Sequence, residues 1–207
     1  MPSRNSIKTY VEEGFYHIYN RGVNKRRIFV EEYDYSVFLN LLKRYLSREP
    51  IKDNLGRKYE TLNGRIELLA YCLMPNHFHL LIFQKDAEAM TSLVRRVSLA
   101  YAMYFNKEHK RTGPLFQERF KASLISKDEY LQHISRYIHL NPEDYQHWEF
   151  SSLPNYLGAK KTNWVSPNRI MELFASREEY REFVADYKDH KEVLDEIKHE
   201  LANSSEV

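Results

Sequence analysis

Two histidines, His77 and His79, flank one bulky apolar residue inside a run that is typical of a buried strand. Side chains alternate across a strand, so the two imidazoles project from one face while Phe78 points to the other. Two imidazoles side by side on a stiff strand form a pre-aligned half of a metal site. Histidines in strands are often just half-buried polar residues, so the pair alone does not establish such a site.

The segment 130–142 supplies a phenol and a carboxamide at helical spacing. Residues four apart share a helix face, so Tyr137 and Asn141 lie one above the other. An amide oxygen is a reasonable third ligand for a hard divalent cation beside two imidazoles. A tyrosine one turn away can aim its oxygen at a phosphate that the cation holds. Tyr130 lies on nearly the same helix face and is an alternative to Tyr137 for this role. Its place at the start of the helix instead favours a role in packing or DNA contact.

The hydrophobic pattern predicts the elements that position these groups. In chain order we expect a strand at 15–20, a helix at 31–47, strands at 66–73 and 77–83, a helix from 86 to about 109, a strand at 120–126, and a helix that Ser126 and Glu129 begin with a capping box. This order predicts an α+β ferredoxin-like split βαβ antiparallel sheet with an added helix that carries Tyr137. Helices would cover one face and leave the other, with both histidines, free for a site.

We expect two parts of the chain, a catalytic domain at 1–160 and a helical C-terminal appendage at 161–207. Residues 148–158 are typical of a loop that packs back on the domain. In the appendage, Ser176 and Glu179 predict a capping box at the start of a helix that runs to Leu201.

The composition is that of a soluble globular protein, with 43% hydrophobic and 29% charged residues in 207. One cysteine, Cys72, excludes a disulfide framework and is expected to be a small core residue in a reducing compartment. The N-terminus lacks the apolar region of a signal peptide, and no apolar run reaches membrane-spanning length. We therefore expect a cytoplasmic protein without a membrane partner.

The net charge of +2 hides a basic middle and an acidic tail. Residues 95–127 hold eight Lys/Arg against two acids, whereas residues from 172 onward hold eleven acids against five Lys/Arg. Tyrosines beside basic residues suit a surface that stacks bases and neutralises phosphates, although tyrosines also pack cores and lysines solvate helices. The candidate DNA-binding residues are Arg21, Lys25, Arg26, Arg27, Arg95, Arg96, Lys110, Arg111, Gln117, Arg119 and Lys121.

Five motifs in order resemble the REP-associated tyrosine transposases, relatives of the insertion-sequence transposases in the HUH single-tyrosine endonuclease superfamily. The motifs are residues 16–22, PNHFHLLI, GPLFQERFKA, YLQHISRYIHLNP and WEFSSLPNYLG. The resemblance covers about residues 14 to 160. It departs just after Asn141-Pro142, where Glu143 and Asp144 replace an apolar residue and an arginine that are common in relatives. This departure puts DNA contact at that point in doubt.

The resemblance implies a ferredoxin-like enzyme that cuts single-stranded DNA with Mg²⁺ or Mn²⁺. It implies a covalent 5′-phosphotyrosine intermediate formed next to DNA hairpins, with REP-like palindromes as partner. Carried onto this chain, His77 and His79 become the paired metal ligands, Tyr137 the nucleophile and Asn141 the third ligand. A phenol with a pKa near 10 needs a cation or base nearby to react at neutral pH, which agrees with this assignment.

Two other functions remain open. A domesticated DNA-binding protein could recognise hairpins without cutting them, and it would need no ligand set. A zinc hydrolase could use His77 and His79, but such sites usually add a third strong ligand and a carboxylate base. Three other histidines, His17, His133 and His139, are expected to be partly exposed polar residues, with His17 on a strand that could neighbour His77.

Overall fold

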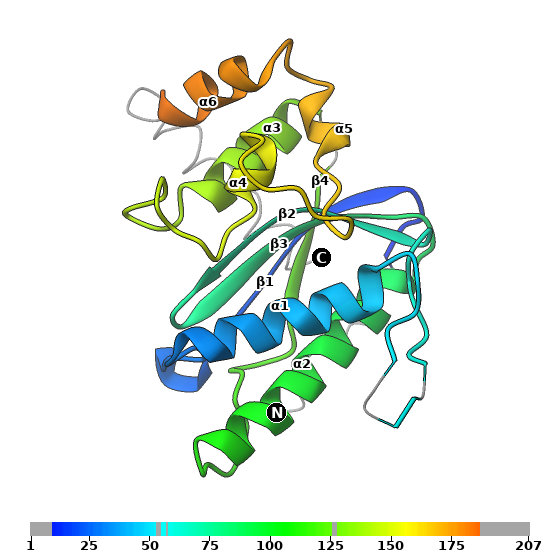
Figure 1. Cartoon of the computed structure of the whole chain (residues 1–207), viewed down its shortest axis with the longest axis vertical. Helices are drawn as coiled ribbons and strands as arrows, with labels where there is room; N and C mark the ends of the chain where they lie inside the picture. Colours follow the sequence, from blue (N-terminus) through cyan, green and yellow to red (C-terminus); the bar gives the residue numbers. More distant parts are fainter. Residues whose placement is uncertain (1–9, 53–54, 57, 126–127, 187–207) are drawn as a thin grey trace, which may run out of the picture.

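A four-stranded antiparallel sheet forms the centre of the structure, a computed structural model that describes residues 10–52, 55–56, 58–125 and 128–186 (Figure 1). The strands are β1 (Gly14–Arg21), β2 (Ile66–Met74), β3 (His77–Gln84) and β4 (Lys121–Ile125), in the spatial order β2-β3-β1-β4. Every pairing is antiparallel. This is the predicted ferredoxin-like arrangement, so the fold class is confirmed.

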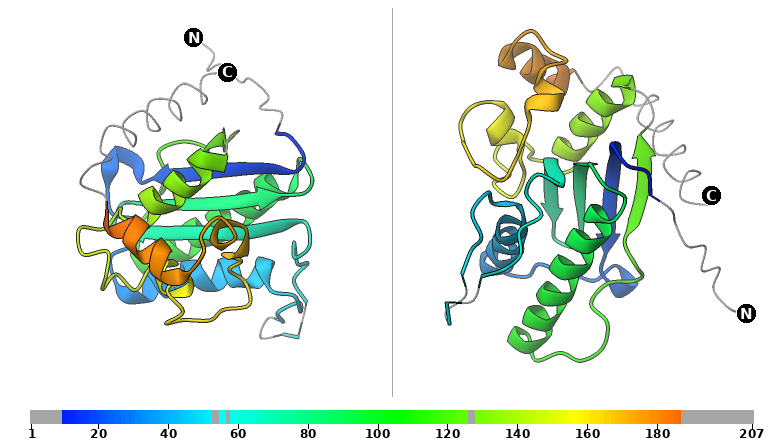
Figure 2. Two further views of the ribbon diagram at one scale, coloured as in Figure 1. Left: turned by 90° about the horizontal axis from the view of Figure 1, so that it is seen from above. Right: turned by 90° about the vertical axis from the view of Figure 1, so that its right-hand side faces the viewer.

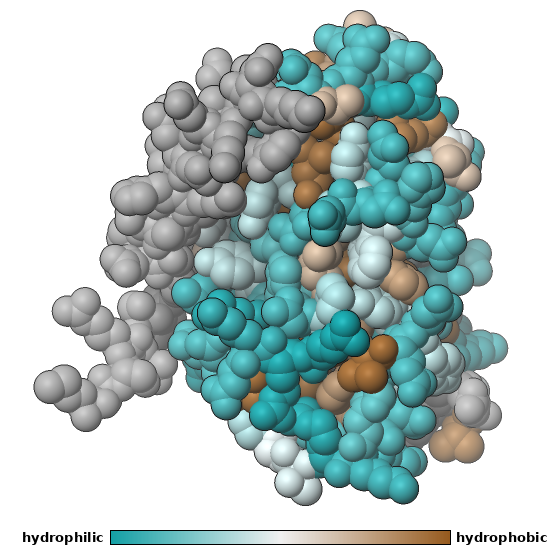
Figure 3. Space-filling model, turned by 90° about the vertical axis from the view of Figure 1, so that its left-hand side faces the viewer, coloured by the Kyte–Doolittle hydropathy of each residue, from teal (hydrophilic) through white to brown (hydrophobic). Residues whose placement is uncertain are grey.

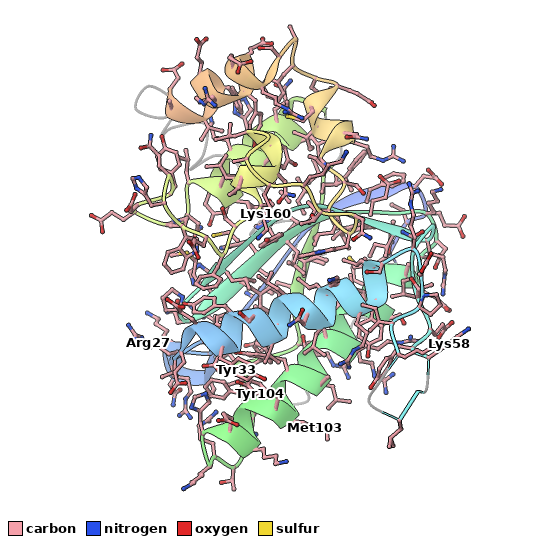
Figure 4. The ribbon with its side chains drawn as sticks, viewed as in Figure 1. Arg27, Tyr33, Lys58, Met103, Tyr104 and Lys160 are labelled. Atoms are coloured by element: carbon pink, nitrogen blue, oxygen red, sulfur yellow. The ribbon has the colours of Figure 1, made fainter. Side chains whose placement is uncertain are left out.

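Helices α1 (Glu32–Leu46) and α2 (Ala89–Glu108) cover one face of the sheet (Figure 2). The alternation of β3 directs Phe78 into this layer, where it packs against Phe38 of α1 at a ring-centroid distance of 5.1 Å. At the rim of the layer, Tyr33 of α1 lies beside Tyr104 of α2 (Figure 4). The predicted direction of Phe78, toward the helices, is therefore correct.

The opposite face carries a second layer, built from α3 (Asp128–His139), α4 (Leu153–Tyr156), α5 (Asn168–Met171) and α6 (Arg177–Ala185) (Figure 1). Leu81 of β3 packs here with Ile134 of α3 and Tyr180 of α6, all fully buried. The expectation of a free second face is wrong, because the apolar and aromatic residues between 131 and 184 need a partner surface and find it on the sheet. The end of this face that carries the histidines opens into a cavity described below.

Helix limits agree with the sequence pattern to within a few residues. Ser126 of the predicted Ser126–Glu129 capping box lies outside the described residues, as does the predicted helix beyond residue 186. Ser176 does cap α6, since its side-chain oxygen accepts from Glu179 N at 3.1 Å. The Glu179 carboxylate accepts from the backbone N–H of Ala175 rather than from that of Ser176, so the second half of the predicted box lies one residue earlier.

A buried polar network fixes the last turn of α3. His139 is fully buried, with Nδ1 2.7 Å from the Tyr180 hydroxyl and Nε2 2.8 Å from the Ser152 hydroxyl. Burial lowers the pKa of His139 to about 3, so the ring is neutral. The expectation that His139 is partly exposed is wrong, because α6 and the segment before α4 cover the helix end. The network joins α3 to both elements.

The exterior of the molecule is polar, and the sheet separates two hydrophobic cores. The face on the left-hand side of Figure 1 is mainly hydrophilic, with small separate apolar patches (Figure 3). Cys72 is buried in β2, where burial raises the pKa of its thiol, as expected for a core residue. None of the helices in the described part of the chain combines the length and apolar character that crossing a membrane requires.

Candidate active site

The first part of the site is the histidine pair at the start of β3. The tight turn after Met74 sends β3 back along β2, and strand alternation places His77 and His79 on the same face. Their ring centroids lie 4.9 Å apart, with planes at 88°. Since β3 is an inner strand between β2 and β1, the backbone that carries both rings is held on both sides.

His77 lies between two asparagine side chains. Its Nδ1 is 2.7 Å from Oδ1 of Asn76, and its Nε2 is 3.0 Å from Oδ1 of Asn141. The Asn76 amide nitrogen donates to the carbonyl of Lys25, which leaves Asn76 Oδ1 to accept the Nδ1–H of His77. A neutral imidazole has one N–H, so with the proton on Nδ1 the Nε2 lone pair faces Oδ1 of Asn141, which accepts a hydrogen bond from His77 Nε2 only when the ring is protonated there. The form protonated at Nδ1 is the tautomer that a metal ligand needs.

Both imidazoles are held in the neutral state. Burial lowers the pKa of His77, the hydrogen bond with Asn141 opposes this change, and the charge of Arg21 adds to it. Burial lowers the pKa of His79 well below its usual value, and the neighbouring His17 and His77 lower it further. Neutral rings keep a lone pair at neutral pH, which a metal ion requires.

Tyr137 reaches the histidines from the second layer. Its ring centroid lies 5.4 Å from that of His79, at 77°. Helix α3 ends at His139, but Asn141 N continues the last turn with a bond of 3.4 Å to the carbonyl of Ile138. The predicted i, i+4 relation therefore brings Tyr137 and Asn141 to the same two histidines, and the structure unites all four residues.

A cavity of about 540 Å³ opens over these groups. Its lining includes the phenols of Tyr19 and Tyr137, both histidines and one carboxylate, Glu118. The remaining residues are mostly polar or basic: Asn20, Arg21, Lys25, Asn76, Gln117, Arg119 and Lys121.

Two segments far apart in the sequence form the basic wall. Residues 21–25 and 115–121 lie side by side, joined by bonds from Val23 N to Leu115 O (3.0 Å) and from Gln117 N to Arg21 O (2.9 Å). The Arg21 guanidinium also donates to Gln117 Oε1 at 2.7 Å. Of the predicted DNA-binding residues, Arg21, Lys25, Gln117, Arg119 and Lys121 are brought together here.

Three further candidates are Arg26 and Arg27, which follow Lys25 in the chain, and Arg111. Burial lowers the pKa of Arg111, and the nearby charge of Arg26 lowers it further, so the two guanidinium groups are close to each other. The guanidinium of Arg111 also lies over the Phe105 ring. The exposed Arg27 follows in the same loop, beside the start of α1 (Figure 4).

The other basic candidates lie on the far side of the sheet, in or just after α2. Arg96 donates to the Glu60 carboxylate at 2.8 Å and lies over the Tyr45 ring. Arg95 and Lys110 are exposed. The lining of the cavity, as far as the described residues define it, includes none of these three. The sequence placed them with the other cations because charge along a chain does not show which face of a sheet a helix covers.

Sequence reasoning missed two residues of the site, both on β1. His17 is 2% exposed rather than partly exposed. Its strand does neighbour His77, as expected, but the ring itself contacts His79, with Nε2 2.9 Å from Nδ1 of that residue. Tyr19 lines the cavity, and its ring lies 5.9 Å from that of His79. The spacing of the two on a predicted strand put them on one face, but the pairing of β1 with β3 was needed to bring that face to the histidines.

The competitor Tyr130 is outside the site. It is half-buried at the start of α3 and packs with the second core rather than lining the cavity. Tyr19 is instead the second phenol near the histidines. Burial raises the pKa of Tyr19, and the charge of Arg21 partly opposes this change. The Tyr19 hydroxyl therefore ionises less readily than an exposed phenol.

The donor set fits a divalent metal ion. Two ligand atoms at adjacent corners of an octahedron with bonds of about 2.1 Å lie about 3 Å apart, and His77 Nε2 and Asn141 Oδ1 are separated by 3.0 Å. No group of three or more His, Cys, Asp or Glu residues within the described ranges could hold a metal ion. The fitting set is therefore two imidazoles and an amide, which does not complete the closed four-ligand shell of a structural zinc and leaves coordination positions open.

The sheet carries the paired histidines, and the helix packed beside them carries Tyr137. A family model described as "Transposase IS200 like" matches residues 10–141, more than half of the chain. The chain therefore belongs to the IS200-like transposase family, and the resemblance that the motifs predicted is confirmed at this level. The match ends at Asn141.

One solved structure agrees with this fold. The chain is similar to a REP-associated tyrosine transposase bound to a REP hairpin, with a TM-score of 0.55, 17% identity, and coverage of 80% of this chain and 92% of that one. A protein described as a transposase from Deinococcus radiodurans R1 gives a TM-score of 0.40 at 20% identity, covering 67% of this chain and 95% of that one, which is too low to support an argument. None of the curated proteins compared matches the chain.

Proposed function

We propose that this protein is a metal-dependent single-strand DNA endonuclease and strand transferase that acts next to DNA hairpins through a 5′-phosphotyrosine on Tyr137. The observation that carries the proposal is the convergence of His77, His79 and Tyr137 in one cavity with a basic wall. Asn141 adjoins this group, with its Oδ1 3.0 Å from His77 Nε2. A water-using nuclease has no need of a buried helix that presents a phenol beside two neutral imidazoles.

The residues divide the reaction among them. Arg21, Lys25, Arg119 and Lys121 neutralise the phosphates of an entering strand. Tyr137 Oη attacks a phosphorus atom, an O–P bond forms, and the 3′ oxygen of the neighbouring nucleotide leaves and takes up a proton. A bound Mg²⁺ or Mn²⁺, held by His77, His79 and Asn141, supplies Lewis-acid stabilisation of the phosphate and the phenolate. The 3′-hydroxyl of another strand can attack the same phosphorus atom and release Tyr137. The phosphotyrosine bond thus retains the energy of the broken phosphodiester, and rejoining needs no ATP.

The DNA partner is proposed on two grounds. The solved relative with the same fold is bound to a REP hairpin, and we extend hairpin DNA with single-stranded flanks to this chain as its substrate. The cavity lies beneath the end of α3, so a flexible single strand can enter it more readily than a paired duplex.

The buried, unpaired Cys72 suits the reducing cytoplasm in which such an enzyme would work.

The test is a covalent-adduct assay. Full-length protein is incubated with 5′- and 3′-labelled hairpin oligonucleotides in Mn²⁺, and the products are separated on a denaturing gel. We expect a protein–DNA adduct through a 5′ phosphate, mapped by mass spectrometry to the peptide around Tyr137. Salt-sensitive hairpin binding without any adduct in Mn²⁺ or Mg²⁺ would instead support a DNA-binding protein that recognises hairpins without cutting them.

A further inference from the structure

The second ligand histidine has an unusual partner, another histidine on the neighbouring strand. Nε2 of His17 lies 2.9 Å from Nδ1 of His79. The ring planes differ by 14° and the centroids are 5.0 Å apart, so the two imidazoles meet edge to edge and nearly coplanar. In the β1–β3 register His17 is opposite Leu81 and His79 is opposite Tyr19, which makes the two histidines diagonal neighbours on one sheet face.

The backbone around His17 allows little movement of this contact. Strand β1 lies between β3 and β4, and His17 itself pairs with Ser123 of β4. The side chain is 2% exposed, and its ring also meets the edge of Tyr137 at 5.9 Å. His17 therefore holds His79 from a fixed position behind the cavity.

The proton in this bond determines what His79 can do. A neutral imidazole carries one N–H, so the 2.9 Å contact between His17 Nε2 and His79 Nδ1 has one donor and one acceptor. If the proton lies on Nδ1 of His79, then His17 Nε2 accepts it and the Nε2 lone pair of His79 is available. If His17 donates, the proton of His79 lies on Nε2 and blocks that position.

We infer that His17 is a positioning residue for the proposed metal site, whose Nε2 accepts the Nδ1 proton of His79 and so leaves the His79 Nε2 lone pair for the metal. This inference rests on the proposed function. Metal-bound histidines commonly donate their second N–H to a carboxylate, carbonyl or water, and here an imidazole takes that part. Because Nε2 of His17 must be unprotonated to accept this hydrogen bond, the proton of His17 lies on Nδ1.

One orphaned atom disfavours this tautomer of His17 in the absence of metal, and it therefore gives the assignment a signature. Nδ1 of His17 is buried and has no hydrogen-bond partner among the described residues. A buried N–H without an acceptor is rare, so this tautomer would not be chosen by His17 on its own. Its detection in the metal-loaded protein would therefore show that the demand of His79 sets the tautomer of His17.

The first test reads the tautomers directly in the unmodified chain. Full-length protein labelled with ¹⁵N at histidine is titrated with Zn²⁺, a diamagnetic stand-in, and long-range ¹H–¹⁵N spectra are recorded. We expect both His17 and His79 to be protonated at Nδ1 in the loaded state. Protonation of His17 at Nε2 in that state would overturn the inference.

The second test uses a pair of variants and Mn²⁺ binding measured by electron paramagnetic resonance without DNA. His17→Leu removes the acceptor and should weaken Mn²⁺ binding by about 10- to 100-fold. His17→Gln keeps an oxygen acceptor at a similar reach and should recover most of the affinity, which a purely structural role of the ring would not allow. Thermal unfolding of both variants checks that the comparison is made between folded proteins.

The outcomes separate this inference from the proposed function. Equal Mn²⁺ affinity of wild type and His17→Leu, with the adduct still formed by the wild type, would overturn the role of His17 alone. Wild-type protein that neither binds Mn²⁺ nor forms an adduct would overturn both.

Discussion

Oδ1 of Asn141 lies 3.0 Å from Nε2 of His77, although 64 positions of the chain separate the two residues. The contact joins the last turn of α3 to the first residue of β3. The same turn presents Tyr137 to His79. One helix end therefore supplies both a candidate ligand and a candidate nucleophile, and the two can be tested separately.

Tyr137→Phe should abolish the covalent adduct. The change removes one oxygen from a half-buried ring, so folding, Mn²⁺ binding and hairpin affinity should stay within about twofold of wild type, whereas no phosphotyrosine can form. The measurement is the denaturing-gel adduct assay together with hairpin binding.

The matched control for this change is Tyr19→Phe, because Tyr19 is the other phenol that lines the cavity. This variant and Tyr130→Phe should both keep the adduct. An adduct that persists in Tyr137→Phe and disappears in Tyr19→Phe would move the nucleophile to β1.

Cleavage should depend on a divalent metal, and the proposed ligand residues should differ in how much each contributes to metal affinity. A chelator should abolish cleavage, and Mn²⁺ or, more weakly, Mg²⁺ should restore it. His77→Ala should remove cleavage and weaken Mn²⁺ binding more than Asn141→Ala does, since an imidazole is the stronger ligand for Mn²⁺. Titration calorimetry of the full chain with Mn²⁺ measures the order. Full cleavage in excess chelator would contradict the metal assignment.

Neutralising the basic wall should weaken hairpin binding and reduce its salt dependence. Arg119→Ala with Lys121→Ala should lower affinity by about tenfold and reduce the slope of log K against log salt by about 0.7 for each single-strand phosphate that the protein no longer neutralises. Fluorescence anisotropy at several salt concentrations measures both quantities.

The comparison variant is Arg95→Ala with Arg96→Ala, on the opposite side of the sheet. We expect a smaller decrease in affinity from this pair, because neither residue lines the cavity and Arg96 already binds Glu60. A decrease equal to that of the Arg119 and Lys121 pair would show that bound DNA reaches α2 as well.

The free energy of unfolding should fall as the pH drops below about 6.5. His139 binds a proton in the unfolded chain near that pH but resists it in the fold, where burial lowers its pKa to about 3. Its contribution is thus fully present above pH 6.5 and is lost progressively down to about pH 3. The decrease amounts to about 1.4 kcal/mol between pH 7.5 and 5.5.

His139→Gln isolates this contribution. The variant is expected to be less stable at pH 7.5, because Tyr180 and Ser152 lose their ring partner. Its stability should fall less steeply with decreasing pH than that of wild type, by about the amount assigned to His139. Urea unfolding at a series of pH values gives both curves, and parallel curves would contradict the assignment.

The sequence predicted the parts of the site that depend on local periodicity. The two-residue spacing of His77 and His79 and the four-residue spacing of Tyr137 and Asn141 are each set within one element. The meeting of those two elements came from the family resemblance and from the order of strands and helices, which the structure bears out.

What the sequence could not supply depends on pairing between distant segments. His17 and His79 are 62 positions apart, and their contact requires the register of β1 against β3. The coverage of the second sheet face was missed for the same reason. Its aromatic residues carry no strong helical period over 140–176, because much of that stretch is turns and single-turn helices that only the sheet beneath them holds in place.

The packing of α3 shows that the limits of a family match need not be the limits of a stable fragment. The match stops at Asn141, but the buried side of α3 is covered by residues that follow it, including Tyr156, Ile170 and Tyr180. A protein expressed only to the end of the match would keep every proposed catalytic group and lose the layer that holds their helix down. The choice of end point for a shortened version should therefore follow the second core, through Val184.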